Sequence, residues 1–129
     1  MSETGNSKIK LIISWVLSIA PCLLFFMSAF FKFAQPEGFA EGLKHMGWEP
    51  STMKALGVVE ILSTLIYLFP KTSILGAILL TGYMGGAIAT HVRVGDPFLM
   101  QIGIGVVLWL ALWLREERLG KLIPLVAGK

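Results

Sequence analysis

The residue of this chain that most needs a chemical explanation is Glu60, which lies inside an apolar run. Leu56-Gly57-Val58-Val59 precede it and Ile61-Leu62 follow it. A carboxylate at the depth of a bilayer costs several kcal/mol, so such residues usually face a partner, a cavity or a proton pathway. We therefore expect Glu60 to contact a compensating partner, to be protonated, or to serve a function.

Other polar residues share the helix face of Glu60. At about 100° per residue, Gly57, Ser63, Thr64 and Tyr67 fall on the same side of a helix. Such a polar stripe in an apolar segment faces the interior of a helical bundle or a water-filled cavity. We expect Glu60 to be the deepest ionisable group, close to the middle of the membrane.

A second group of polar residues is expected nearer the outer boundary. Lys32 ends the first apolar run, His91 and Arg93 end the third, and Gln101 begins the fourth. Together with Glu60 they predict a polar funnel that relays a proton or binds the polar head of a lipid-soluble molecule such as a quinone. The candidate ligand-binding or proton-relay residues are Lys32, Glu60, Tyr67, His91, Arg93 and Gln101, and catalytic residues stay unassigned.

The same residues also admit a structural interpretation. Glu60 would then be a protonated carboxyl that fixes the register of the bundle through a hydrogen bond. Lys32 would only extend toward the interface, while His91 and Arg93 would satisfy the end of their helix. The structural reading is favoured for His91 and Arg93, and the functional one for Glu60.

Four apolar segments must position these residues. The chain has 129 residues, of which 55% are apolar and only 15% charged. Segments 11–31, 51–69, 72–92 and 98–114 are each about long enough to cross a hydrocarbon core. Their short connections predict an all-α, membrane-embedded, up-down-up-down four-helix bundle in one domain, 11–119, with tails 1–10 and 120–129.

The connection between the first two spans has a pattern of its own. Phe39, Leu43 and Met46 recur at helical spacing among charged residues. This pattern predicts a short amphipathic helix in the outer interface. Two roles stay open: a surface helix that only bridges the gap, which is favoured, and a lid over the mouth of the bundle.

Small residues define one face of the third span. Gly82 and Gly86 form a small-xxx-small pair, which allows another helix to approach closely. We expect them to be helix-packing residues within the monomer; a homodimer seam is the alternative. His91 is expected on the opposite side of this helix.

The sequence also excludes several classes of protein. A single cysteine, Cys22, permits neither an intrachain disulfide nor a CxxC redox pair. Metal-ligand spacings, phosphate-binding loops, nucleophilic triads and nucleic-acid-binding elements are missing from the sequence. We therefore expect no metal and no nucleic acid, and the chain has no self-contained catalytic motif, so its enzymatic status stays open.

The distribution of basic residues predicts the orientation. Seven of the eleven Lys and Arg residues fall on the side of the two termini, and four on the other side. Cytoplasmic loops carry the excess of Lys and Arg, so both termini are expected in the cytoplasm.

Several segments give the chain a resemblance to the DoxX-like family over about residues 11–124. They are Phe31-Lys32-Phe33, Gly57-Val58-Val59-Glu60, Leu68-Phe69-Pro70-Lys71-Thr72 and the run from Gly82 to His91 with Arg93 and Gly95-Asp96. The resemblance implies a four-helix protein of the bacterial inner membrane, with Lys32, Glu60 and His91 at the family's polar positions. Relatives include a subunit of a thiosulfate:quinone oxidoreductase.

Three functions follow. The first is a small accessory subunit that binds a quinone or another lipophile and supports a redox partner protein, because no side chain here carries electrons unaided. The second is a structural membrane protein without a ligand, alone or as a homo-oligomer. The third, ranked last, is a proton-coupled carrier that uses Glu60.

Overall fold

The computed structural model describes residues 3–126, and the regular elements within them are helices joined by short turns and loops. The elements are α1 (Glu3–Ala34), α2 (Phe39–Met46), α3 (Pro50–Leu68), the 3-10 turn η1 (Pro70–Thr72), α4 (Ser73–Val94), α5 (Leu99–Arg115) and α6 (Glu117–Gly120). No strand occurs within these residues. The all-α prediction is confirmed, and so is a short helix between the first two long ones.

Three of these helices are long and apolar enough to cross a membrane: α1 from Asn6, α3, and α4 together with η1. α5 is apolar but has only 17 residues. α1 begins well before residue 11, so the predicted N-terminal tail is largely helical; extending an existing helix is easy because each added residue gains a hydrogen bond. The helix also continues through Pro21.

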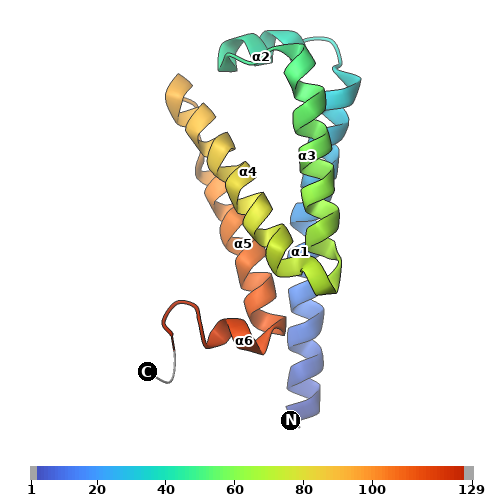
Figure 1. Cartoon of the computed structure of the whole chain (residues 1–129), viewed down its shortest axis with the longest axis vertical. Helices are drawn as coiled ribbons and strands as arrows, with labels where there is room; N and C mark the ends of the chain where they lie inside the picture. The colour runs from blue at the N-terminus through green and yellow to red at the C-terminus, as the bar shows by residue number, and fades with distance from the viewer. Residues whose placement is uncertain (1–2, 127–129) are drawn as a thin grey trace.

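The helices form two diverging pairs (Figure 1). α1 packs against both α3 and α5, and α4 packs against both α3 and α5. α3 and α4 meet at the end where η1 joins them and separate toward the other end. There α2 lies across the top of the molecule, while α6 lies at the opposite end, near the two termini.

The close contact between α3 and α4 is made at Gly76. A side chain at Gly76 would overlap the backbone nitrogen and Cα of Tyr67. Gly82 and Gly86, by contrast, have no atom of another element within 4 Å of where a side chain would begin. The expectation that Gly82 and Gly86 pack against a helix of the same chain is therefore wrong, because α4 leans away from α3 above Gly76.

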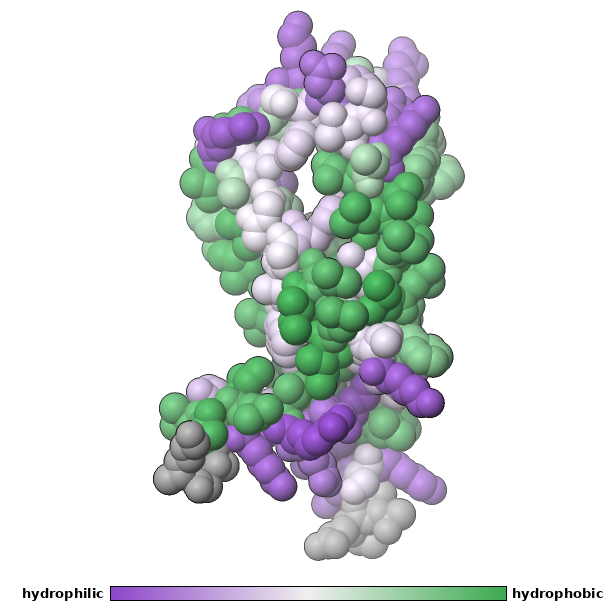
Figure 2. Space-filling model, in the orientation of Figure 1, coloured by the Kyte–Doolittle hydropathy of each residue, from purple (hydrophilic) through white to green (hydrophobic). Residues whose placement is uncertain are grey.

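Apolar side chains cover the outside of the molecule as well as its core. The buried core includes Cys22, Phe25, Leu80 and Leu108. Figure 2 shows apolar residues over the middle of the visible face and polar residues at both ends. Exposed apolar surface on this scale is unusual in a protein that folds in water. The chain is an integral membrane protein.

Candidate functional site

A cavity of about 510 Å³ lies between the two helix pairs, beneath α2. Figure 2 shows this half of the molecule hollowed between its two arms. Most of the lining is apolar, with a few polar groups among it, which is typical of a small-molecule site. The apolar lining includes Leu24, Phe25, Phe39, Leu43, Met46, Trp48, Met53, Leu56, Met84, Ala87, Met100 and Ile104.

An ion pair between Lys32 and Glu60 lies in the wall of this cavity. Lys32 Nζ donates to Glu60 Oε1 at 3.1 Å and to Ser28 Oγ at 2.7 Å. The side chain of Glu60 is only 1% exposed and that of Lys32 15%. Because the two charges compensate each other, the pair supplies strong hydrogen-bonding groups without net charge.

The polar stripe of α3 faces the interior as the sequence predicts. Gly57, Glu60, Ser63, Thr64 and Tyr67 are all buried. Thr64 donates to the carbonyl of Glu60 at 2.7 Å, which satisfies its hydroxyl within the helix. The helical period therefore identified the correct face, although only the Glu60 part of it reaches the cavity.

Tyr83 is a cavity residue that the sequence reasoning missed. Its ring centroid lies 5.7 Å from Lys32 Nζ, and the residue lines the same cavity as Glu60. The signal was its place between Gly82 and Met84, in the run from Gly82 to His91 that carries part of the family resemblance. Tyr83 adds an O–H donor and an aromatic surface beside the ion pair.

His91 and Gln101 line the same cavity. His91 Nδ1 donates to the carbonyl of Ala87 at 2.7 Å, so Nε2 is the acceptor nitrogen of the neutral ring. His91 lines the cavity together with Met84 and Ala87, the residues expected on its own face of the helix, while Gly82 and Gly86 line it as well.

The Oε1 atom of Gln101 is buried and has no hydrogen-bond partner within residues 3–126. An unsatisfied buried carbonyl oxygen is costly, and a bound hydroxyl or amine would satisfy it.

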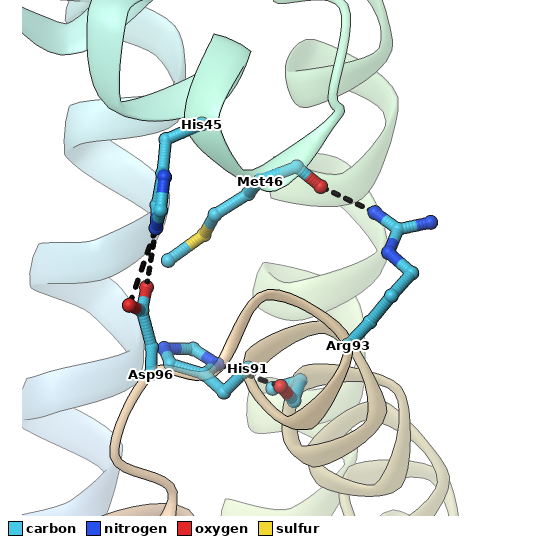
Figure 3. A network of polar contacts seen from close by, with 6 residues as sticks. His45, Met46, His91, Arg93 and Asp96 are labelled. Carbon is cyan, nitrogen blue, oxygen red and sulfur yellow. Dashed lines mark hydrogen bonds and ion pairs between the residues drawn. The ribbon is translucent and has the colours of Figure 1, made fainter.

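α2 covers the end of the cavity, and we call it the roof helix. Phe39, Leu43 and Met46 line the cavity from above, and Leu43 is buried. Figure 3 shows two polar contacts that tie this helix to the end of α4. Arg93 donates to the carbonyl of Met46, and His45 Nε2 lies 3.2 Å from both carboxylate oxygens of Asp96.

Arg93 is therefore a residue of the roof contact and does not line the cavity. The cavity also differs from the expected outward-opening funnel. Apolar side chains of α2 cover the end at which the funnel was expected to open. Gly47 ends the roof helix in the left-handed conformation, with φ of 83°, and a side chain there would touch the Arg93 guanidinium. Of the two roles left open for this segment, the structure favours the lid.

Tyr67 belongs to a second polar cluster, away from the cavity. Its hydroxyl donates to the carbonyl of Leu108 at 2.7 Å and lies 3.1 Å from Ser18 Oγ. Arg115 donates to Ser18 Oγ at 2.6 Å and stacks over the ring of Trp15 at 4.0 Å. These groups join α1, α3 and α5 at the terminal end of the molecule. Tyr67 thus connects helices in the interior and does not line the cavity.

Beyond this cluster, at the exposed start of α6, the Arg118 guanidinium holds the pKa of Glu116 below its usual range through a hydrogen bond of 2.7 Å.

Within residues 3–126, His, Cys, Asp and Glu side chains form no group of three or more that could bind a metal ion. Cys22 is buried in the core, where it packs against apolar neighbours. The cavity lining offers hydrogen-bonding groups and apolar surface.

The geometry defines the class as an all-helical membrane protein with a roofed, largely apolar cavity and a compensated ion pair in the cavity wall. The sequence profile of the DoxX-like family matches residues 16–114, so the chain belongs to the DoxX-like family. No curated protein and no solved structure matches the chain.

Proposed function

We propose that α1, α3, α4 and α5 cross the membrane in alternate directions. The apolar middle of the molecule and its polar ends support this arrangement (Figure 2). At 17 residues, α5 is at the short limit for a span of the hydrocarbon core. The excess of Lys and Arg beside the termini supports a plasma-membrane protein with both termini in the cytoplasm.

The function that the site supports best is binding of a lipophilic molecule with a neutral polar head. The observation that carries this proposal is the Lys32–Glu60 pair, which lies in the wall of a largely apolar cavity of about 510 Å³. A compensated pair favours a neutral head over a phosphate or a carboxylate, because a net charge would have no counter-charge left to meet it.

A quinone or quinol fits the donors and acceptors that line this cavity. Lys32 and Tyr83 donate hydrogen bonds, while Glu60 and Gln101 Oε1 accept them. Quinone oxygens accept hydrogen bonds and quinol hydroxyls donate them, so both forms find partners. Bound there, the quinone would supply the electron-carrying chemistry that the side chains lack.

The role of the chain in such a reaction is to bind and orient the head. Lys32 holds an oxygen of the head, Glu60 keeps Lys32 in place, and the roof helix excludes water. Electron transfer then requires a partner protein, which makes this chain an accessory subunit of a redox complex. A proton-coupled carrier, the least favoured alternative, would use the same carboxylate but would require the roof to open to water.

Quinone binding can be measured by quenching of tryptophan fluorescence, because Trp48 lines the cavity. We expect Glu60→Gln to weaken binding of a ten-carbon-tailed benzoquinone by about tenfold, the effect of losing one charge-assisted contact. Glu49→Gln, at an exposed position in the same part of the chain, should leave the affinity unchanged. Equal affinities for Glu60→Gln and the wild-type protein would contradict the proposal.

A homo-oligomer is a second candidate, and the open glycine face of α4 favours it. Gly82, Gly85 and Gly86 are exposed, and within residues 3–126 no atom of another element lies within 4 Å of where their side chains would begin. A second copy would pack there with its own small residues. Native mass spectrometry from mild detergent distinguishes the two functions, because it reports bound lipophiles and subunits in one spectrum.

A further inference from the structure

The cavity is closed toward the aqueous side and open toward the side of the molecule. The roof helix covers its top and is attached through Arg93 and through the His45–Asp96 contact. α3 and α4 diverge toward this end of the molecule (Figure 1), and the space-filling view is open between the two arms (Figure 2). We define the window as the gap between Leu56 of α3 and Gly82 and Gly86 of α4, all of which line the cavity.

The window lies at the depth of the ion pair. α3 rises from its end at Leu68 to Glu60, and α4 rises from Ser73 to Gly82. At about 1.5 Å per residue, Glu60 and Gly82 each lie about 12–14 Å along their helix from the turn that joins α3 to α4. Gly82 therefore stands at the level of Glu60, and Gly86 stands about 6 Å higher. In a membrane this level is within the hydrocarbon region.

The two glycines leave this rim without side chains. Both are exposed, and both also line the cavity, so they mark its edge. On the other side of the molecule, between α1 and α5, the corresponding edge carries the side chains of Leu24 and Met100. A flexible chain leaving the cavity meets less obstruction at the glycines.

We propose that the ligand is a head-and-tail lipid whose apolar tail passes through the window into the bilayer. This inference rests on the proposed function, because it takes the head to lie at Lys32 and Glu60. A tail at this level stays among lipid chains, so the ligand is loaded from the membrane and not from water. Gly82 and Gly86 are then specificity-determining residues: they admit the tail and do not contact the head.

The test compares two probes on the purified full-length protein in lipid nanodiscs. One probe is a dimethoxy-methyl-benzoquinone ring alone, and the other is the same ring with a ten-carbon alkyl tail. Quenching of Trp48 fluorescence reports both affinities, with Trp48→Phe as the blank. The control substitution is Gly85→Leu, because Gly85 is equally exposed and helical but does not line the cavity.

We expect Gly82→Leu and Gly86→Leu to weaken binding of the tailed probe by about tenfold, the effect of withdrawing about two methylene groups from an apolar contact. Binding of the ring alone should change less than about twofold, and Gly85→Leu should change neither affinity. If a glycine variant does not fold, Leu56→Phe narrows the same window from α3 without adding a tryptophan and should give the same selective loss.

Four results would overturn the inference. Equally weakened binding of both probes would show that the glycines contact the head. Unchanged binding of both probes would show that the tail does not pass through the window. Selective loss of binding of the tailed probe in Leu24→Phe, with normal binding in Gly82→Leu, would place the tail between α1 and α5. A change from dimer to monomer on Gly82→Leu, measured by light scattering, would assign this face to a second copy. If the wild-type protein binds neither probe, the proposed function itself fails.

Discussion

Lys32 and Glu60 lie 28 residues apart in the chain, yet their side chains form a 3.1 Å contact that joins α1 to α3. Removing one member of a buried ion pair leaves the other charge uncompensated, which costs about 3–5 kcal/mol in proteins. We expect Lys32→Met to lower the free energy of unfolding by about 3 kcal/mol. Glu60→Gln also leaves a charge without its partner, but Gln still accepts a hydrogen bond and the remaining Lys32 ammonium is 15% exposed, so it should cost less, about 1 kcal/mol.

Denaturant-induced unfolding in detergent, followed by circular dichroism, measures both changes. Lys54→Met is the matched control, because Lys54 is exposed on α3 and takes part in no described ion pair. A loss for Lys32→Met no larger than that for Lys54→Met would show that the pair does not hold the helices together.

Gly76 sets the distance between α3 and α4. A side chain there would overlap the backbone of Tyr67, so the helices must separate to admit one. We expect Gly76→Ala to destabilise the fold by about 1–3 kcal/mol, the usual cost of overpacking. Gly85→Ala should be neutral or stabilising by up to about 1 kcal/mol, because alanine favours the helix and has open space there. Thermal unfolding in detergent measures both, and equal melting temperatures would contradict the role of Gly76.

The hydroxyls of Tyr67 and Tyr83 should have different effects when removed. Tyr67→Phe loses the hydrogen bond to Leu108 and should cost about 0.6–1.7 kcal/mol of stability, between the average and the largest value found for interhelical hydrogen bonds in a membrane protein. It should leave quinone affinity unchanged, because Tyr67 does not line the cavity.

Tyr83→Phe removes a donor from the cavity and should weaken quinone binding several-fold, since one hydrogen bond contributes about 1 kcal/mol. Fluorescence titration and thermal unfolding of both variants separate the two roles. Loss of affinity in Tyr67→Phe together with normal affinity in Tyr83→Phe would reverse the assignment.

The roof helix should loosen when its contacts to α4 are removed. Asp96→Asn weakens the contact with His45, and Arg93→Met removes the donor to Met46 (Figure 3). We expect faster hydrogen exchange within residues 39–46 in both variants, because local opening then costs less free energy. Glu41→Gln, on an exposed position of the same helix, should leave exchange unchanged. Unchanged hydrogen exchange in a variant that carries both Asp96→Asn and Arg93→Met would mean that apolar packing alone keeps the roof helix in place.

The sequence by itself determined the features that depend on local periodicity and hydropathy. The apolar segments, the short helix between the first two, and the buried face of α3 through Glu60 and Tyr67 could all be read from it. The helical repeat places these side chains together whatever lies next to them. The same local reasoning missed the early start of α1, because polar residues can extend a helix that already exists.

Only the tertiary structure decided which of these groups meet. Whether Lys32 reaches Glu60, and whether Tyr67 lines a cavity or a core, depends on how segments distant in sequence are placed. The lean of α4 away from α3 starts at Gly76 and leaves Gly82 and Gly86 facing open space. A small residue permits close packing but does not require it, so the pattern alone could not tell a helix contact from a window.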